Sequence, residues 1–146
     1  MIHQKDSILI KQTLGQVFEI ARDMEKLSEF IPEYKNVKTL NQGQDKIEVE
    51  VRIKLMGIPI IFVSSGIITP NQSIRYEQIK GPLKGLITEW RFEQVESKTQ
   101  LSVIHTLNLR IPVLGRFLEG MIYNLVIKHM ASDLLVNLKK EAERLV

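Results

Sequence analysis

The chain has 146 residues, 44% of them hydrophobic and 25% charged, which is an ordinary composition for a soluble globular protein. It contains no cysteine, so disulfides, thiol catalysis and cysteine-bound metals are excluded. It shows no signal peptide and no apolar run of about eighteen residues, which is the length that a membrane span needs. We therefore expect one ligand-binding domain over residues 1–146, located in the cytoplasm. The net charge of +3 permits transient contact with an anionic membrane surface without requiring it.

The first third of the chain predicts one strand and two short helices. Residues 2–12 alternate in the manner of a strand. Thr13 is followed three residues later by Gln16, which is the capping-box spacing and predicts the start of a helix. A second short helix is expected to end before Pro32, because proline does not continue a helix.

The middle of the chain predicts about six strands joined by tight turns. The clearest is residues 46–55, where Ile, Val and Leu alternate with Glu, Arg and Lys. This pattern is typical of an antiparallel strand with one buried and one solvated face. Short connections favour antiparallel neighbours. The other expected strands are residues 34–40, 60–69, 73–80, 86–95 and 99–110.

The last part of the chain, from about Gly115 to Val146, predicts one long helix, because its apolar residues recur three or four apart. Residues 120–130 are apolar on nearly all sides, which indicates cover on more than one side. This helix is the only element large enough to cover the buried face of the sheet. We therefore predict an α+β protein in which a curved antiparallel sheet of about seven strands wraps around the C-terminal helix, with a concave apolar space between them.

Two stretches resemble motifs of a known superfamily. Residues 23–32, DMEKLSEFIP, are similar to the pattern D-x-E-x-Y-P-E-F-x-P, and residues 81–92, GPLKGLITEWRF, are similar to G-P-F-x-x-L-x-x-x-W-x-F. Both patterns are found in the coenzyme Q-binding branch of the START-like (SRPBCC) superfamily, which also includes polyketide cyclases/dehydrases and lipid-transfer domains. The chain departs from these patterns at Leu27, Ser28 and Leu83.

The resemblance implies the helix-grip fold and binding of a hydrophobic small molecule between the sheet and the long helix. It implies a lipid, an isoprenoid quinone or a polyketide as the ligand. We favour the hypothesis that the protein is a non-enzymatic binder or carrier, because the sequence shows no cluster of catalytic side chains. Some members of the superfamily are cyclases, aromatases or dehydratases, and one bacterial branch acts on ribosomes. An enzyme and a ribosome-associated factor therefore stay open as alternatives.

Candidate ligand-contacting residues are those expected to face the space between sheet and helix. Alternation places His105 on the same face as Leu101 and Leu107, where it could orient a ligand oxygen or move a proton, or equally serve as a core histidine. Phe30 forms either a lid or an ordinary contact with the sheet, and the direction of Phe62 is ambiguous. The predicted pocket residues are Phe30, Phe62, Tyr76, Trp90, Phe92, His105, Phe117, Met121 and Leu125.

Other site chemistries are disfavoured by the spacing of the polar residues. Three scattered histidines without an H-x-x-x-H spacing predict no metal site, and we expect no cofactor. The acid pairs Glu48/Glu50 and Glu89/Glu93 fall on solvated faces. A basic stripe on the outer sheet is interrupted by Glu48 and Glu50, so we expect no DNA binding, although contact with ribosomal RNA stays open. The residues of this stripe are Lys35, Lys38, Lys46, Arg52 and Lys54.

Overall fold

The structure, a computed structural model, describes residues 2–55, 57–107 and 128–144. The described elements, in chain order, are β1 Ile2–Ile10, α1 Leu14–Arg22, the 3-10 helix η1 Met24–Lys26, α2 Leu27–Phe30, β2 Tyr34–Gln42, β3 Lys46–Leu55, β4 Ile58–Thr69, β5 Ser73–Lys80, β6 Ile87–Val95, β7 Lys98–Leu107 and α4 Lys128–Glu143. The predicted order of elements is confirmed, with strand ends shifted by a few residues. The predicted residues 108–110 of the last strand lie outside the described residues.

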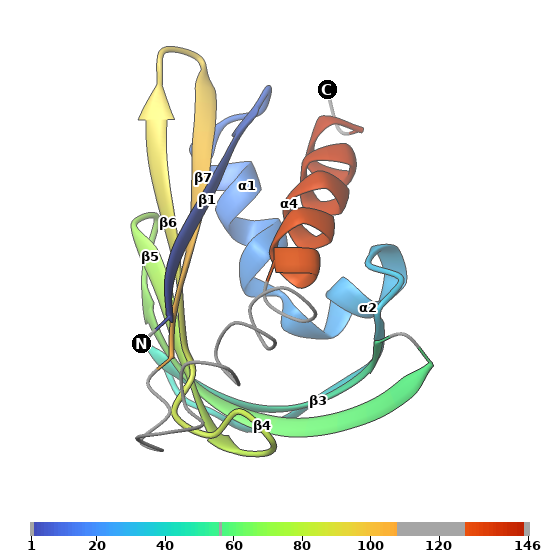
Figure 1. The fold of residues 1–146 in the computed structure, drawn as a ribbon. Coiled ribbons are helices and arrows are strands. Elements are labelled where there is room, and N and C mark those ends of the chain that lie inside the picture. The colour runs from blue at the N-terminus through green and yellow to red at the C-terminus, as the bar shows by residue number, and fades with distance from the viewer. Residues whose placement is uncertain (1, 56, 108–127, 145–146) are drawn as a thin grey trace.

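The strands form a seven-stranded antiparallel sheet in the order β1-β7-β6-β5-β4-β3-β2. The sheet curves strongly, and its concave side holds α1 and α4 (Figure 1). Register shifts in the β2–β3 and β4–β5 pairs contribute to this curvature, because an irregularity in the ladder bends the strand. The predicted helix-grip architecture is therefore confirmed.

Strand β3 shows why the sheet has one buried face. Ile47, Val49, Val51 and Ile53 are buried, whereas the charged residues between them lie on the outer face. Because side chains alternate along a strand, the same rule fixes the inward residues of each neighbouring strand through the register. The buried residues of β3 form part of one hydrophobic core with α1, α2 and α4.

Helix α4 covers part of the concave face with a stripe of buried residues. Its C-terminal end is fixed to the connection between β1 and α1, because Lys11 N donates to Glu143 Oε2 at 3.1 Å and Gln12 Nε2 donates to the Ala142 carbonyl at 3.3 Å. The predicted segment from Gly115 to residue 127 lies outside the described residues. The buried stripe consists of Ala131, Leu134, Leu135, Leu138 and Ala142.

The start of α1 is capped by the Thr13 side chain, as the sequence predicts, but the second bond of the capping box has a different partner. Gln16 N donates to Thr13 Oγ1 at 3.4 Å, which satisfies one of the free amides at the helix start. The reciprocal bond of the capping box is made by a different residue, because Gln12 Oε1 and not the Gln16 side chain accepts from Thr13 N, at 2.8 Å. The helix therefore begins where predicted.

The short helices η1 and α2 pack against the edge strand β2. Glu25 Oε1 accepts a hydrogen bond from Thr39 N at 3.1 Å, so the first glutamate of the DMEKLSEFIP stretch holds the short helices to the strand. Met24 of η1 and Leu27 of α2 are buried. None of the described helices is both long and apolar enough to cross a membrane.

Candidate ligand-binding site

A cavity of about 340 Å³ lies between the concave face of the sheet and α4. This volume is at the lower end of the range for small-molecule sites, about 300–1,000 Å³. Most of the lining side chains are apolar or aromatic. The described lining residues are Met24, Tyr34, Val51, Ile53, Ile60, Phe62, Ser64, Tyr76, Gln78, Pro82, Leu83, Leu86, Thr88, Trp90, His105, Ala131 and Leu134.

The register of the sheet explains how these residues meet. Tyr76 on β5 lies opposite Thr88 on β6, and Thr88 lies opposite His105 on β7, so one row crosses the cavity wall. The row continues to Gly66 on β4, which lies opposite Tyr76. A Cβ atom on Gly66 would lie 2.6 Å from the Tyr76 ring, so the glycine leaves room for the phenol to lie across β4. Gly66 therefore sets the position of one aromatic wall.

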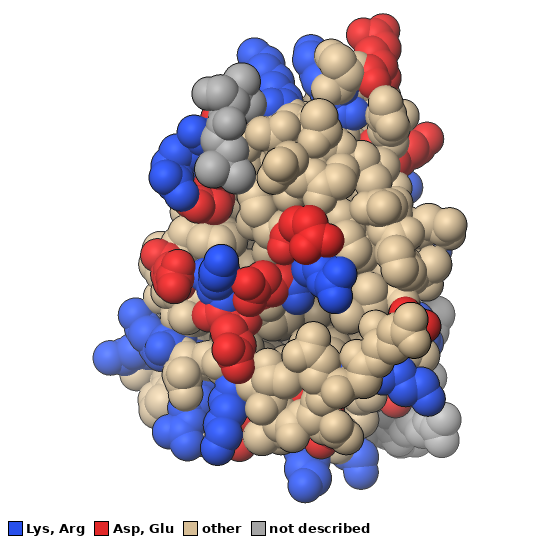
Figure 2. Space-filling view, turned by 180° about the vertical axis from the view of Figure 1, so that it is seen from behind, with Lys and Arg blue, Asp and Glu red and all other residues tan. Residues whose placement is uncertain are grey.

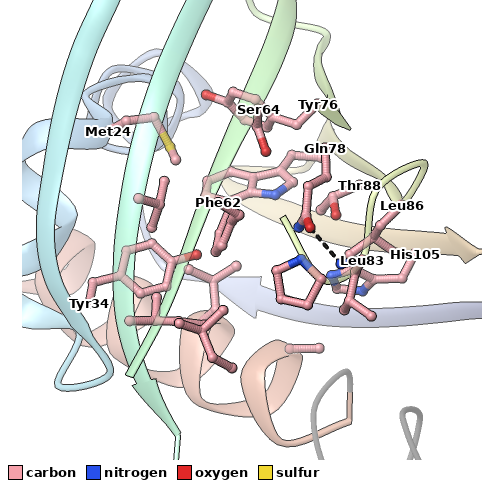
Figure 3. Close-up of a pocket in the computed structure, with 17 residues that line it drawn as sticks. Met24, Tyr34, Phe62, Ser64, Tyr76, Gln78, Leu83, Leu86, Thr88 and His105 are labelled. Atoms are coloured by element: carbon pink, nitrogen blue, oxygen red, sulfur yellow. Dashed lines mark hydrogen bonds between the residues drawn. The ribbon is translucent and has the colours of Figure 1, made fainter. Parts of the chain in front are cut away.

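The turn after β5 closes another wall of the cavity. Leu83 N donates to Gln78 Oε1 at 2.7 Å, drawn as a dashed line in Figure 3, and this bond holds Leu83 over the cavity. Gly81 has φ +127°, and a Cβ atom there would lie 2.7 Å from Phe62 Cβ. Only glycine combines this backbone conformation with so close an approach. The Gly-Pro pair of the GPLKGLITEWRF stretch therefore has a structural role in shaping the cavity.

Four of the predicted pocket residues line the cavity, namely Phe62, Tyr76, Trp90 and His105. The ambiguity over Phe62 is removed, since its side chain points inward with Ser64 and Ile60 on the same strand. Tyr76 and Trp90 make an edge-on contact, with ring centroids 6.2 Å apart.

Two other predicted residues lie elsewhere. Phe92 faces inward but packs edge-on against Phe18 of α1, with ring centroids 5.1 Å apart, and is not among the lining residues. Phe30 is partly buried and packs against the hydrophobic core, which is the ordinary contact of the two alternatives. The remaining predictions, Phe117, Met121 and Leu125, lie outside the described residues.

Several lining residues were not predicted from sequence. Gln78 and Ser64 follow from the alternation that places Tyr76 and Phe62 inward, once the direction of one residue on each strand is known. Met24 and Tyr34 come from the short helices and from the start of β2, and Figure 3 shows them across the cavity from Leu83 and His105. No periodic pattern marks these two residues, because they lie where helix and strand begin.

Three of the side chains that line the cavity each have one buried polar atom without a hydrogen-bond partner within the described part of the chain: Tyr76 Oη, Trp90 Nε1 and His105 Nδ1. Burial lowers the pKa of His105 to about 4, although the negative charge of Asp6 acts in the opposite direction. Burial and the charge of Glu33 raise the pKa of Tyr34 to about 12, and burial also raises the pKa of Tyr76. His105, Tyr34 and Tyr76 are therefore uncharged at pH 7.

The charged groups lie mainly on the outside of the sheet. Glu50 pairs with Arg52 at 3.6 Å and also lies opposite Lys38, so the predicted basic stripe is interrupted by acidic residues. Figure 2 shows Lys and Arg interspersed with Asp and Glu on the side of the molecule seen from behind. Glu89 pairs with Arg91. No group of three or more metal-ligating side chains occurs in the described residues.

The fold and cavity agree with a comparison of the sequence with known families. A family described as "Polyketide cyclase / dehydrase and lipid transport" matches residues 10–134. The chain belongs to this family. The matched range includes all the described cavity residues, from Met24 to Leu134. The cavity therefore lies within the part of the chain that matches the family.

Curated relatives that this chain resembles include ribosome association toxins. RatA of Escherichia coli K12 is 26% identical over 84 residues, which is 58% of this chain and 53% of that protein. RatA of Vibrio cholerae is 28% identical over 90 residues, which is 62% of each protein. The match therefore spans little more than half the length of these curated relatives.

Solved structures show the same fold. The aromatase/cyclase Zhui from Streptomyces sp. R1128 superposes with a TM-score of 0.87 at 19% identity, covering 98% of this chain and 94% of that one. A START superfamily protein from Mycobacterium smegmatis has a TM-score of 0.77 at 15% identity, covering 99% of each chain. These likenesses extend over nearly the whole chain of this family member and establish its START-like fold.

Proposed function

We propose that the protein binds a hydrophobic small molecule in the cavity between the sheet and α4, and acts as a carrier. The observation that carries this proposal is the cavity of about 340 Å³, whose described lining is largely apolar. Removing apolar ligand surface from water would supply most of the affinity, at about 25 cal/mol per Å² before the costs of ordering the ligand. A lipid, an isoprenoid quinone and a polyketide all fit this description. We place the carrier in the cytoplasm, in transient contact with a membrane surface.

The described lining supports a carrier more than an enzyme. Catalysis by proton transfer needs a group whose pKa lies near the working pH. His105 is the described lining side chain that ordinarily titrates near neutral pH, and burial lowers its pKa to about 4. Ser64 lies on β4 and His105 on β7, and β5 and β6 lie between these strands in the sheet, so the two side chains are not cross-strand neighbours as a paired nucleophile and base would be.

Mass spectrometry under native conditions, on protein purified from its own host, tests the proposal directly. A stoichiometric hydrophobic molecule is the expected result, and extraction then identifies its chemistry. Filling the cavity with Ala131→Leu should abolish ligand retention, because Ala131 is buried on the cavity wall. Ser132→Leu, on the exposed side of the same helix, is the matched control and should retain the ligand. Equal retention by both variants, or no ligand from host extracts, would contradict the proposal.

Ribosome association is the second candidate function, and the similarity to the RatA proteins favours it. It predicts salt-sensitive co-sedimentation with ribosomal subunits, because contacts with RNA phosphates release counterions. Replacing Lys35, Lys38 and Arg52 by glutamate should then abolish co-sedimentation. Unchanged sedimentation of this variant would count against a role for the outer basic residues.

A cyclase, aromatase or dehydratase is the third candidate, and the position of His105 in the cavity wall is the observation behind it. His105→Gln should then abolish turnover of a cyclising substrate while leaving its binding intact. Retained turnover would exclude His105 as the acid or base.

A further inference from the structure

Three side chains that line the cavity contain polar atoms without a hydrogen-bond partner among the described residues. Trp90 is 2% exposed, Tyr76 is 5% exposed and His105 is 7% exposed, so water reaches none of them freely. Their atoms Nε1, Oη and Nδ1 have no hydrogen-bond partner within the described ranges. Most buried polar side-chain atoms in proteins are hydrogen-bonded, so three exceptions around one cavity need an explanation.

We propose that the cavity selects an uncharged ligand bearing oxygen, and that Trp90 Nε1, Tyr76 Oη and His105 Nδ1 are the atoms that hydrogen-bond it. This inference rests on the proposed function, since it specifies the ligand of the same cavity. It separates ketones, quinones, alcohols and phenols from plain hydrocarbons and from fatty-acid or phosphate anions.

The requirement for oxygen follows from the chemistry of the three atoms. The indole N–H of Trp90 is a donor only, so its partner is an acceptor such as a carbonyl or hydroxyl oxygen. The Tyr76 hydroxyl donates or accepts, and His105 Nδ1 does either according to the tautomer. Tyr76 and Trp90 lie on neighbouring strands and both side chains line the same cavity, so a single ligand can contact both.

The exclusion of charge follows from the groups around the cavity. Among the described residues that line it, none is Lys, Arg, Asp or Glu. The charges of Asp6, Arg22 and Glu33 are close enough to influence His105, Tyr76 and Tyr34, but none of the three belongs to the described lining. A carboxylate in the cavity would therefore lose its hydration without gaining a described counter-charge, which is costly.

Calorimetric binding of three naphthalene probes of similar shape tests this selection. The probes are 2-isopropylnaphthalene, 2-acetylnaphthalene and 2-naphthoate, which present a hydrocarbon, a neutral acceptor and an anion. We expect 2-naphthoate to bind at least about tenfold more weakly than the ketone, equivalent to about 1.4 kcal/mol. Equal binding of the ketone and the anion would overturn the exclusion of charge.

Variants identify the atoms that bind the ketone. The ketone has one oxygen, which accepts at most two hydrogen bonds. At least one of Trp90→Phe, Tyr76→Phe and His105→Leu should therefore reduce ketone affinity about tenfold relative to hydrocarbon affinity, equivalent to about 1.4 kcal/mol. Using the ratio of the two probes removes the effect of altered cavity size, which acts on both. The control His3→Leu should leave this ratio unchanged, because His3 is exposed and bonds Thr106 Oγ1.

The outcomes separate this inference from the proposed function. If the variants weaken the hydrocarbon and the ketone equally, the cavity binds ligands but these atoms do not recognise oxygen, and the inference is overturned alone. If the wild-type protein binds none of the three probes, binding in the cavity is itself contradicted. Tyr76→Phe removes a single atom, so a folded variant is available even if a larger change prevents folding.

Discussion

The two ends of the concave face are built from the same sheet but are filled differently. At one end, Phe18 of α1 packs edge-on against Phe92, and Leu138 of α4 is fully buried. At the other end, α4 presents Ala131 and Leu134 to the sheet, and a cavity of about 340 Å³ is left. Large side chains from two helices fill the first end, whereas the small side chain of Ala131 leaves space beside the sheet at the second.

The polar groups differ in the same way. At the filled end, Thr99 is fully buried and its hydroxyl donates to the Gln12 carbonyl at 2.9 Å. At the hollow end, Trp90 Nε1 and His105 Nδ1 have no described partner. The filled end therefore contributes more packing and hydrogen bonding to the stability of the fold. At the hollow end, buried polar atoms lack a described partner and space is left for a ligand.

The largest effect should come from truncating the filled end. Phe18→Ala removes a ring that is 1% exposed, and we expect a loss of about 3–5 kcal/mol in the free energy of unfolding. Phe62→Ala, at the half-buried wall of the cavity, should cost less, because its side chain already borders open space. Urea denaturation of both variants measures the difference, and equal losses would contradict the contrast between the two ends.

The next largest effect should come from acidification, which destabilises the folded protein through His105 in the cavity wall. The folded pKa of His105 is about 4 and its ordinary value is 6.5, so between these values the unfolded chain binds the proton and the folded chain does not. Stability is therefore lost as the pH falls from about 6.5 to 4, by up to about 3 kcal/mol at 1.36 kcal/mol per unit. His105→Leu should flatten this part of the pH profile. An unchanged profile would show that His105 does not cause it.

A smaller loss should follow from adding a methyl group at the cavity wall. Gly66→Ala would place a Cβ atom 2.6 Å from the Tyr76 ring, and we expect a cost of about 1–3 kcal/mol together with a displaced phenol. Gly15→Ala is the control, since a Cβ atom there meets nothing within 4 Å. Thermal unfolding and ligand binding of both variants test this, and equal behaviour would mean that Tyr76 moves freely.

The smallest effect should be spectroscopic. Trp90 is the single tryptophan of the chain and is 2% exposed, so its emission should be that of an indole in an apolar environment. An acceptor ligand in the cavity should shift or quench this emission without unfolding the protein. Titration with 2-acetylnaphthalene at fixed temperature measures it, with urea-unfolded protein as the reference. No change at saturating ligand would mean that the ligand does not approach Trp90.

The sequence predicts which face of the sheet a residue occupies better than which end. Alternation correctly places His105 and Phe92 on the inner face. It does not show that Phe92 lies beneath Phe18 whereas Trp90, two residues earlier, borders the cavity, because that depends on where the helices cross the sheet. The strand pattern and the cap at Thr13 are local and could be predicted. The bond between Gln78 and Leu83 depends on the path of a turn and could not.

The bond from Thr39 N to Glu25 also affects how the protein behaves when crowded. An outermost strand with free amides is a template on which another chain can add a strand, which leads to aggregation. On β2, one of those amides is already occupied by a carboxylate, and the ladder with β3 is irregular on either side of it. An incoming strand would have to displace Glu25 and pass the exposed Lys35 and Lys38. The acidic residue that anchors the short helices thus also hinders the addition of another strand at the β2 edge of the sheet.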